Sequence, residues 1–146
     1  MESAGVIRFD KWGGESGIEK FITKQTGCKP FSGAGINYRA TKNLTILRSV
    51  DDTAYYDDNL KDPNRPYYTL FGPIGDQDQS EKHFNAPLLD PMKTHRIYLY
   101  RLAKEGKKNV YYWYGKYGIK RVFDKLHPDL NGKMRKIILL ELERTS

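Results

Sequence analysis

The pattern of apolar and polar residues predicts a chain made mostly of β-strands. Tyr, Ile, Val and Trp dominate the three clearest strand candidates, residues 95–103, 109–123 and 134–144. Turn-forming residues separate these segments, among them Gly106 and Gly132. A shorter aromatic run at 66–72 predicts one further strand.

The segment 35–50 predicts a β-hairpin, because two β-rich runs flank residues 41–43. Alternation in its second run places two pairs of residues on opposite faces, Ile46 and Val50 on one and Leu47 and Ser49 on the other. Between 51 and 66 the β pattern gives way to Asp, Asn and Pro, which predicts a long loop or a set of turns.

Short helices complete the pattern. Residues 16–27 carry apolar side chains at helical spacing, Ile18, Phe21 and Ile22. Ser16 is a candidate N-cap and Gly27 a candidate stop, and residues 86–91 predict a helical turn closed by Pro91. The predicted class is therefore α+β, mostly β, with a curled sheet or pseudo-barrel and one or two short helices.

Length and composition predict one soluble domain over residues 1–146. A chain of this size with 38% hydrophobic residues can bury a core without disulfides, and its single cysteine, Cys28, cannot form an internal one. The N-terminus shows no charged-then-apolar leader, and no apolar run approaches the ~20 residues that span a bilayer. We expect a reducing intracellular compartment and no membrane association.

The net charge of +7 is unevenly distributed. Residues 1–50 carry eight basic and four acidic side chains, residues 51–91 carry three and nine, and residues 92–146 carry fourteen and five. Basic surfaces bind polyanions, because each neutralised phosphate releases counterions. A charge that serves solubility alone is an equally good explanation of the basic part.

Enzyme motifs are weak in this sequence. His83, His95 and His127 are scattered, and "HFN" at 83–85, "SEK" at 80–82 and "ELER" at 141–144 only partly imitate nuclease motifs. One cysteine and three dispersed histidines give no zinc spacing. We therefore expect no catalytic residue, metal or cofactor. A small metal-dependent nuclease of the restriction type, with carboxylates among Asp76, Asp78 and Glu81, stays open as an alternative.

An aromatic and acidic constellation favours a binding site instead. Asp57 and Asp58 lie between two tyrosine pairs, Tyr55 and Tyr56 before them and Tyr67 and Tyr68 after them. If the flanks met, the rings could stack on a nucleobase and a carboxylate could accept a hydrogen bond from its exocyclic amine. A structural role, with the tyrosines in the core and the aspartates in turns, is the alternative that the residues alone favour.

The order of several motifs resembles that of SRA (SET and RING associated) domains, which have a PUA-like β-fold and bind modified cytosine in DNA. The motifs that carry the resemblance over residues 36–144 are "YYDD" at 55–58, "YYTLFG" at 67–72, "GDQDQ" at 75–79, "FNAPLL" at 84–89, "HRIYLYR" at 95–101 and "WYGKYGIKRV" at 113–122. The chain departs from the family where Leu70, Phe71 and Pro73 replace a glycine-rich loop. It also lacks the aspartate of the family's Tyr-Asp-Gly strand and the Asn-Lys-Arg finger of some members. The "GDQ" segment is similar to the SRA-like modules of modification-dependent restriction enzymes.

The resemblance implies a module that flips a modified base, 5-methylcytosine or a related C5-modified cytosine, out of double-stranded DNA. Tyr55 and Tyr68 would sandwich the base, Asp58 would accept from cytosine N4 and Thr69 would contact the base edge, within a pocket that includes Tyr56, Asp57 and Tyr67. Basic residues of the C-terminal third would hold phosphates without reading sequence, namely Arg96, Arg101, Lys104, Lys107, Lys108, Lys116, Lys120, Arg121, Lys133, Arg135 and Lys136.

Two further expectations follow from the resemblance. A nuclease domain or subunit is a candidate partner, and the protein is expected to be DNA-associated, in a prokaryotic cytoplasm or a nucleus. An RNA-binding PUA- or EVE-like module stays open as a second alternative, because it shares the fold class and the basic surface.

Overall fold

The computed structural model of the protein describes residues 5–30, 35–50, 62–72, 75–80, 85–129 and 131–145. Within these residues it contains two α-helices and a seven-stranded sheet. In chain order the elements are β1 (Ile7–Phe9), α1 (Ile18–Thr26), β2 (Ile36–Arg39), the 3-10 turn η1 (Ala40–Lys42), β3 (Leu44–Val50), β4 (Tyr67–Thr69), α2 (Asn85–Leu89), β5 (Arg96–Glu105), β6 (Lys108–Pro128) and β7 (Met134–Arg144).

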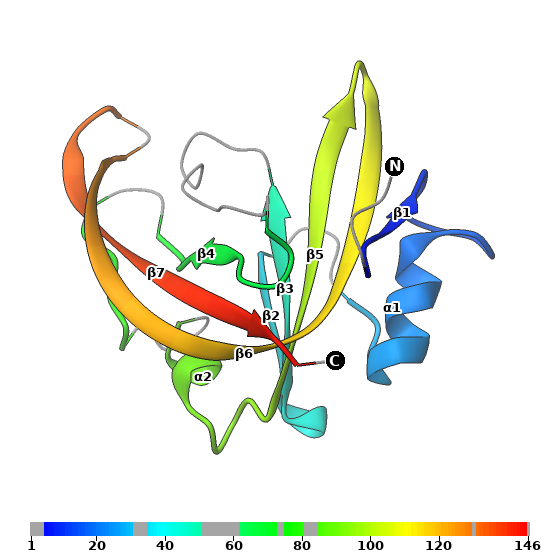
Figure 1. Ribbon diagram of the computed structural model, residues 1–146, viewed down its shortest axis with the longest axis horizontal. Helices are drawn as coiled ribbons and strands as arrows, with labels where there is room; N and C mark the ends of the chain where they lie inside the picture. Colours follow the sequence, from blue (N-terminus) through cyan, green and yellow to red (C-terminus); the bar gives the residue numbers. More distant parts are fainter. Residues whose placement is uncertain are drawn as a thin grey trace.

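The strands form one open, strongly curled mixed sheet in the order β2-β3-β5-β6-β7-β4, and β1 pairs with β6 (Figure 1). All pairings are antiparallel except that of β3 with β5. That parallel pairing requires a crossover, and the chain makes it through β4 and α2. The predicted fold class, mostly β with a curled sheet and short helices, is confirmed.

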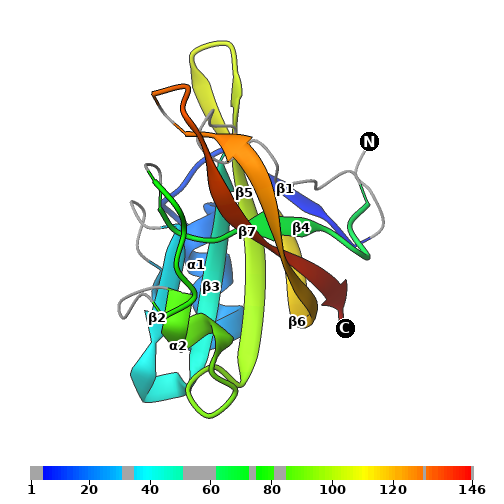
Figure 2. The same cartoon turned by 90° about the vertical axis from the view of Figure 1, so that its left-hand side faces the viewer.

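Two cores lie on the two faces of the central strands. On one face, α1 packs Ile18 and Ile22 against alternate residues of β5 and β6 such as Tyr100 and Trp113. On the other, Leu88 of α2 belongs to a larger core whose further members include Ile36, Leu47, Tyr68, Leu99, Tyr117 and Leu140. Figures 1 and 2 show α1 and α2 on opposite sides of β2, β3 and β5. The curl of the sheet brings β4 and β7 into the second core.

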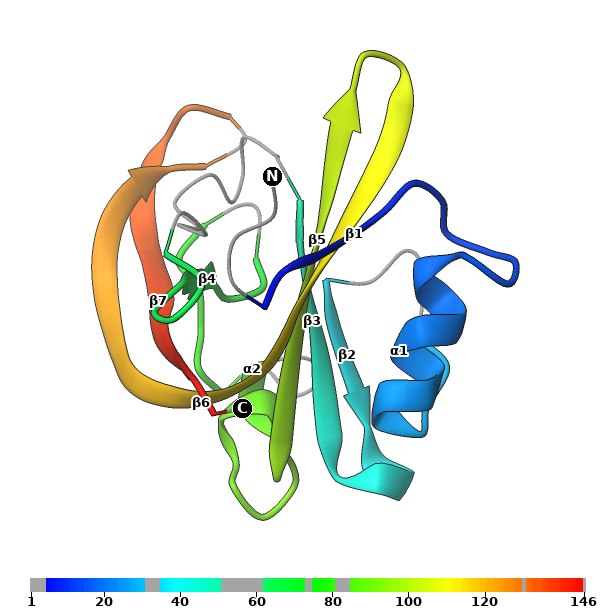
Figure 3. The ribbon, with the colours of Figure 1, turned by 45° about the vertical axis from the view of Figure 1, so that its right-hand side comes forward.

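Most predicted elements are confirmed, with three differences. The helix starts after Gly17, without a side-chain cap, so Ser16 is not its N-cap, while Gly27 ends it in the left-handed conformation at φ 78°. Strand β6 continues well past residue 123 to Pro128. Figure 3 shows β1, which the pattern did not predict, alongside β6 with α1 beside it. A three-residue edge strand is too short to show alternation.

Two hairpins project from the sheet. The β5–β6 tip comprises residues 104–109, and the β6–β7 tip comprises residues 124–129 and 131–136. Figure 1 shows both tips on the same side of the molecule as the C-terminal end of β3. Among the described residues, no helix is long and apolar enough to span a membrane.

Candidate functional site

Tyr68 joins β4 to the opposite end of the sheet. It pairs with Leu140 of β7, and its side chain is only 4% exposed. Its hydroxyl lies 2.9 Å from the carbonyl oxygen of Gly35 and 3.0 Å from that of Arg48, to which it donates. The side chain therefore holds β4 against the start of β2 and the C-terminal half of β3, which are distant in the sheet order.

Tyr67 and Thr69 lie on the other face of β4, since successive residues of a strand point to opposite sides. The ring of Tyr67 packs edge-on against Phe123 with 5.8 Å between the ring centroids. Thr69 is 3% exposed. The structure thus places the predicted pocket residues Tyr67 and Tyr68 on different faces and does not bring them together.

The remaining predicted pocket residues, Tyr55, Tyr56, Asp57 and Asp58, lie outside the described residues. Both ends of the segment that contains them are anchored. Val50 closes β3 in pairing with Leu102 of β5, and the chain that leads into β4 is tied to the end of β7. This second anchor consists of backbone hydrogen bonds from Leu142 to Pro66 (2.9 Å) and from Arg144 to Asn64 (3.0 Å).

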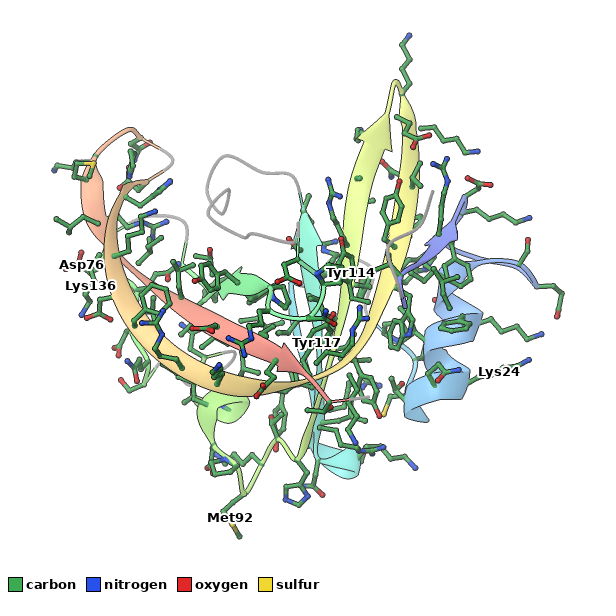
Figure 4. All side chains as sticks on the ribbon, viewed as in Figure 1. Lys24, Asp76, Met92, Tyr114, Tyr117 and Lys136 are labelled. Atoms are coloured by element: carbon green, nitrogen blue, oxygen red, sulfur yellow. The ribbon has the colours of Figure 1, made fainter. Side chains whose placement is uncertain are left out.

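The phenol of Tyr117 strengthens that second anchor. Its hydroxyl donates to the carbonyl oxygen of Pro63 at 2.6 Å and accepts from Arg144 at 3.3 Å. Burial raises the pKa of Tyr117, and the hydrogen bond from Arg144 opposes the rise. The phenol therefore stays protonated and keeps its donor at neutral pH. Figure 4 shows Tyr117 and Tyr114 on the part of β6 that faces this junction.

The "GDQ" segment after β4 has a structural role. Gln77 is 3% exposed, its amide nitrogen donates to the carbonyls of Leu70 (2.6 Å) and Gly72 (3.1 Å), and its amide oxygen accepts from the backbone of Ile138 (2.8 Å). Together with backbone hydrogen bonds from Leu70 to Ile138 (3.0 Å) and from Gln77 to Lys136 (2.9 Å), this side chain fixes the loop after β4 to β7.

Asn85, the first residue of α2, completes the same loop. It is fully buried, accepts from the backbone of Phe71 at 2.9 Å, and donates to the carbonyls of Phe71 (3.1 Å) and Asp78 (2.9 Å). Arg135 of β7 adds a hydrogen bond to Gly75 at 2.9 Å and another to the carbonyl of Gly72. Gln77 and Asn85, which belong to motifs that carried the resemblance, therefore hold the loop in place through hydrogen bonds to its backbone.

The carboxylates of the nuclease alternative are already engaged. Asp76 accepts from the backbone of Lys136 at 2.7 Å, and Asp78 accepts from the backbone and hydroxyl of Ser80 at 2.8 Å each. The two hydrogen bonds from Ser80 lower the pKa of Asp78. Glu81 lies outside the described residues, and among those described no three His, Cys, Asp or Glu side chains form a group that could hold a metal.

The predicted phosphate-binding residues divide into separate surfaces. Lys104, Lys107 and Lys108 are exposed at the β5–β6 tip. Arg96 begins β5 at its far end, about 26 Å from Lys104 along the strand at ~3.3 Å per residue. Lys116 pairs with Tyr98 near that end too. These residues therefore do not form one patch with the tip.

Two of the other predicted basic residues, Arg101 and Arg121, already have partners within the sheet. Arg101 lies over the ring of Tyr112, with 5.8 Å to the centroid. Arg121 lies 3.0 Å from Glu141 and stacks on Phe123 at 4.4 Å. Lys120 is exposed beside it on β6. The β6–β7 tip adds three exposed lysines, Lys125, Lys133 and Lys136. The sequence analysis did not single out Lys125.

The anchoring of Tyr68 had no signal in the sequence. Its two acceptors are main-chain carbonyls, of Gly35 and Arg48, and a backbone acceptor can belong to any residue type. The exposed apolar residues of the β6–β7 tip, Leu126 and Met134, were missed as well. Each stands alone among polar residues in the sequence, and single exposed apolar residues are common in proteins and so give no signal.

Three solved structures show what this fold is similar to. The MspJI restriction endonuclease in complex with a 27-mer oligonucleotide aligns at a TM-score of 0.66 and 18% identity, covering 97% of this chain and 42% of that chain. KRYPTONITE in complex with mCHH DNA, an H3 peptide and SAH aligns at 0.60 and 15%, covering 96% and 31%. The SUVH5 SRA domain in complex with methylated CHH DNA aligns at 0.55 and 19%, covering 86% and 83%.

The fold is therefore that of SRA domains, as the sequence resemblance predicted. The chain spans less than half of the KRYPTONITE and MspJI chains and most of the SUVH5 SRA chain. No family model matches the sequence, and neither does any curated protein.

Proposed function

We propose that this protein recognises a modified base in double-stranded DNA by flipping it into a pocket between the end of β3 and the start of β4. The observation that carries the proposal is the match of 97% of the chain to the MspJI endonuclease bound to an oligonucleotide, together with matches to SRA structures bound to methylated DNA. A further match is the SRA-containing ScoMcrA, in complex with phosphorothioated DNA.

The anchored ends of the segment 51–61 support a pocket at this place. Tyr68 ties β4 to Gly35 and Arg48, and the junction near Pro63 is held by Tyr117. A pocket that must select one base benefits from a fixed frame, since ordering it on binding would cost affinity.

The modified base is 5-methylcytosine or a related C5-modified cytosine in this proposal. Tyr55 stacks on it, at about 1–3 kcal/mol per base, and Asp58 accepts from its N4 amine. Tyr68 and Thr69 are 4% and 3% exposed and lie on opposite faces of β4, so we assign them to the frame of the pocket and not to the base contacts. Flipping costs a few kcal/mol of stacking and pairing, and the pocket contacts offset it. Exposed lysines at the two hairpin tips hold phosphates on either side.

The protein acts as a recognition module without catalysis of its own in this proposal, in a DNA-associated setting within the cell. A nuclease domain or subunit is its proposed partner, since the MspJI, ScoMcrA and TagI structures that it matches are restriction endonucleases. Incubation of modified and plain plasmid with magnesium or manganese tests this part, and cleavage by the purified chain would contradict it.

Asp58→Ala tests the pocket. Loss of the carboxylate removes the acceptor for the exocyclic amine, so we expect the preference for modified over plain duplex to fall at least tenfold, while weak, salt-sensitive binding persists. Titration of both duplexes at one stated salt concentration measures the preference. The matched control is Glu15→Ala, which also removes one carboxylate, at an exposed position before α1 and away from both hairpin tips. Full preference in Asp58→Ala would refute the pocket assignment.

A further inference from the structure

A hollow of about 400 Å³ lies on the face of the sheet that α1 covers, between α1, β1 and the first half of β6 (Figure 3). Cavities of roughly 300–1,000 Å³ hold small molecules. Tyr68, which frames the proposed base pocket, belongs to the core on the opposite face of the sheet, so the two sites are separate. This α1 hollow has an apolar lining of Ile7, Phe21, Tyr98 and Trp113 and a polar lining of Gln25, Lys116 and Arg144.

A β-bulge in β6 brings a cation to this aromatic surface. Strand β6 carries one extra residue, Tyr114, where its register with β5 shifts. Residues three apart in a regular strand point to opposite faces of the sheet. Trp113 and Lys116 instead share the α1 face, because they pair with Tyr100 and Tyr98, which both belong to the core under α1. The bulge therefore places the ammonium group of Lys116 on the same face as the aromatic rings.

The apolar lining is built from aromatic rings that contact one another. Tyr98 and Trp113 stack with 5.8 Å between their centroids and 24° between their planes, and Phe21 meets Trp113 edge-on at 5.6 Å. Ile7 is 39% exposed and Phe21 is half-buried, so both offer apolar surface to a ligand. Aromatic rings carry partial positive charge at their edges, which favours contact with the nitrogen and oxygen acceptors of a nucleobase. A planar ring rich in acceptors is therefore suited to this lining.

Two cations complete the α1 hollow. Lys116 is half-buried and forms no ion pair or side-chain hydrogen bond with any residue that the structure describes. The guanidinium of Arg144 donates to the carbonyl oxygen of Tyr114 and to the hydroxyl of Tyr117, both at 3.3 Å, which fixes its position. A phosphate monoester carries a charge of about −1.5 to −2 at neutral pH and three acceptor oxygens, so it matches two cations better than a carboxylate does.

We infer that the α1 hollow binds a nucleotide, with its ring on the apolar lining and its phosphate at Lys116 and Arg144. The inference goes beyond the proposed function and does not depend on it, since none of these residues belongs to the proposed base pocket. It also gives a role to Lys116, which the strand geometry separates from the β5–β6 tip. A free nucleotide and the terminal nucleotide of a DNA strand offer the same chemistry, and the experiment below distinguishes them.

The test is a calorimetric titration of the full chain with deoxyadenosine 5′-monophosphate, deoxyadenosine and inorganic phosphate. We expect the nucleotide to bind about tenfold or more tightly than either part alone, because only the nucleotide fills both linings. Lys116→Ala should weaken nucleotide binding about tenfold, since a hydrogen bond to a charged group is lost. Lys24→Ala is the matched control and should change affinity less than about twofold. Lys24 is exposed on α1 and points away from the sheet (Figure 4).

A second variant guards against a loss of folding. Gln25→Glu keeps the shape of an exposed side chain on α1 and places a carboxylate beside the phosphate. We expect nucleotide affinity to fall about threefold or more through charge repulsion. Thermal unfolding of this variant should match that of the wild type, since exposed substitutions of this kind perturb folding little.

Three results would overturn the inference. They are the absence of nucleotide binding up to about 1 mM, equal affinities for nucleotide and inorganic phosphate, and unchanged nucleotide affinity in Lys116→Ala or Gln25→Glu. A 5′-phosphorylated single-stranded oligonucleotide then identifies the source of the ligand. Affinity equal to that of the mononucleotide, with the same loss in Lys116→Ala, indicates a strand end. Oligonucleotide binding that Lys116→Ala leaves unchanged indicates a free nucleotide, and both results support the site.

Discussion

Tyr67 and Tyr68 are neighbours in sequence with opposite environments. Tyr68 is buried and its hydroxyl proton is shared by two main-chain carbonyls, while Tyr67 packs on Phe123 on the other face of β4. Among the described residues no hydrogen bond of the Tyr67 hydroxyl is present. The phenol of Tyr68 therefore contributes to the frame of the proposed pocket, and that of Tyr67 does not.

Replacing Tyr68 by Phe tests this difference. Loss of the buried hydroxyl should lower the free energy of unfolding by about 1 kcal/mol, because the carbonyl oxygens lose a donor in a buried setting. Tyr67→Phe is the matched control, with a change expected near zero. Urea denaturation of both variants measures the values, and equal stability of the two would contradict the account.

Two buried amide side chains and two backbone hydrogen bonds to β7 fix the loop after β4. Gln77 and Asn85 provide six hydrogen bonds to the backbone of residues 70–78 and 138, all between 2.6 and 3.1 Å. This arrangement covers part of the free edge of β7 beyond the short strand β4. Covered edges do not pair with other chains, so the loop also limits aggregation.

Gln77→Ala should destabilise the fold clearly. Two buried hydrogen bonds and one part-buried one disappear together, and the carbonyl of Leu70 and the N–H of Ile138 lose these partners, so a loss of about 3 kcal/mol is expected. Gln79→Ala, two residues away and exposed, is the control and should stay within about 0.5 kcal/mol of the wild type. Thermal melting of both variants measures the effect. A Gln77 variant as stable as the control would show that the loop is held by other contacts.

At the scale of the whole molecule, alternation predicted the strands that have one or two buried faces. Strands β3, β5 and β7 were predicted nearly to their ends in this way. The helix α1 was predicted from apolar residues at helical spacing. The last part of β6 escaped prediction because Asp124, Lys125 and Leu126 are all exposed and show no alternation. A curled sheet can bring distant strands together, so the contact between Tyr68 and Gly35 depends on topology that no local pattern contains.

The same limit applies to the basic surface. A count of lysines and arginines predicted phosphate binding, but it could not separate Lys104 and Lys107 at a hairpin tip from Arg96 at the other end of the same strand. Nor could it show that Arg121 is paired with Glu141. Charge along the sequence predicts the class of ligand, whereas the strand geometry decides which charges face it.

Salt dependence of binding separates these charges. Lys104→Ala/Lys107→Ala should weaken binding to any duplex and reduce the slope of log affinity against log salt by about 2, one for each phosphate that the variant no longer neutralises. The control is Lys24→Ala on α1, on the opposite side of the molecule from the β6–β7 arm (Figure 4), which should leave the slope unchanged. Equal slopes for the wild type and the tip variant would remove the β5–β6 tip from the DNA interface.

The most direct test of modified-base recognition is a titration of the wild-type protein against a matched set of duplexes at one salt concentration. The set contains unmodified, hemimethylated, fully methylated and hydroxymethylated cytosine in one sequence. We expect at least one modified duplex to bind tenfold or more tightly than the unmodified one, in keeping with a pocket that selects a flipped base. Equal affinity for all four duplexes would contradict the account.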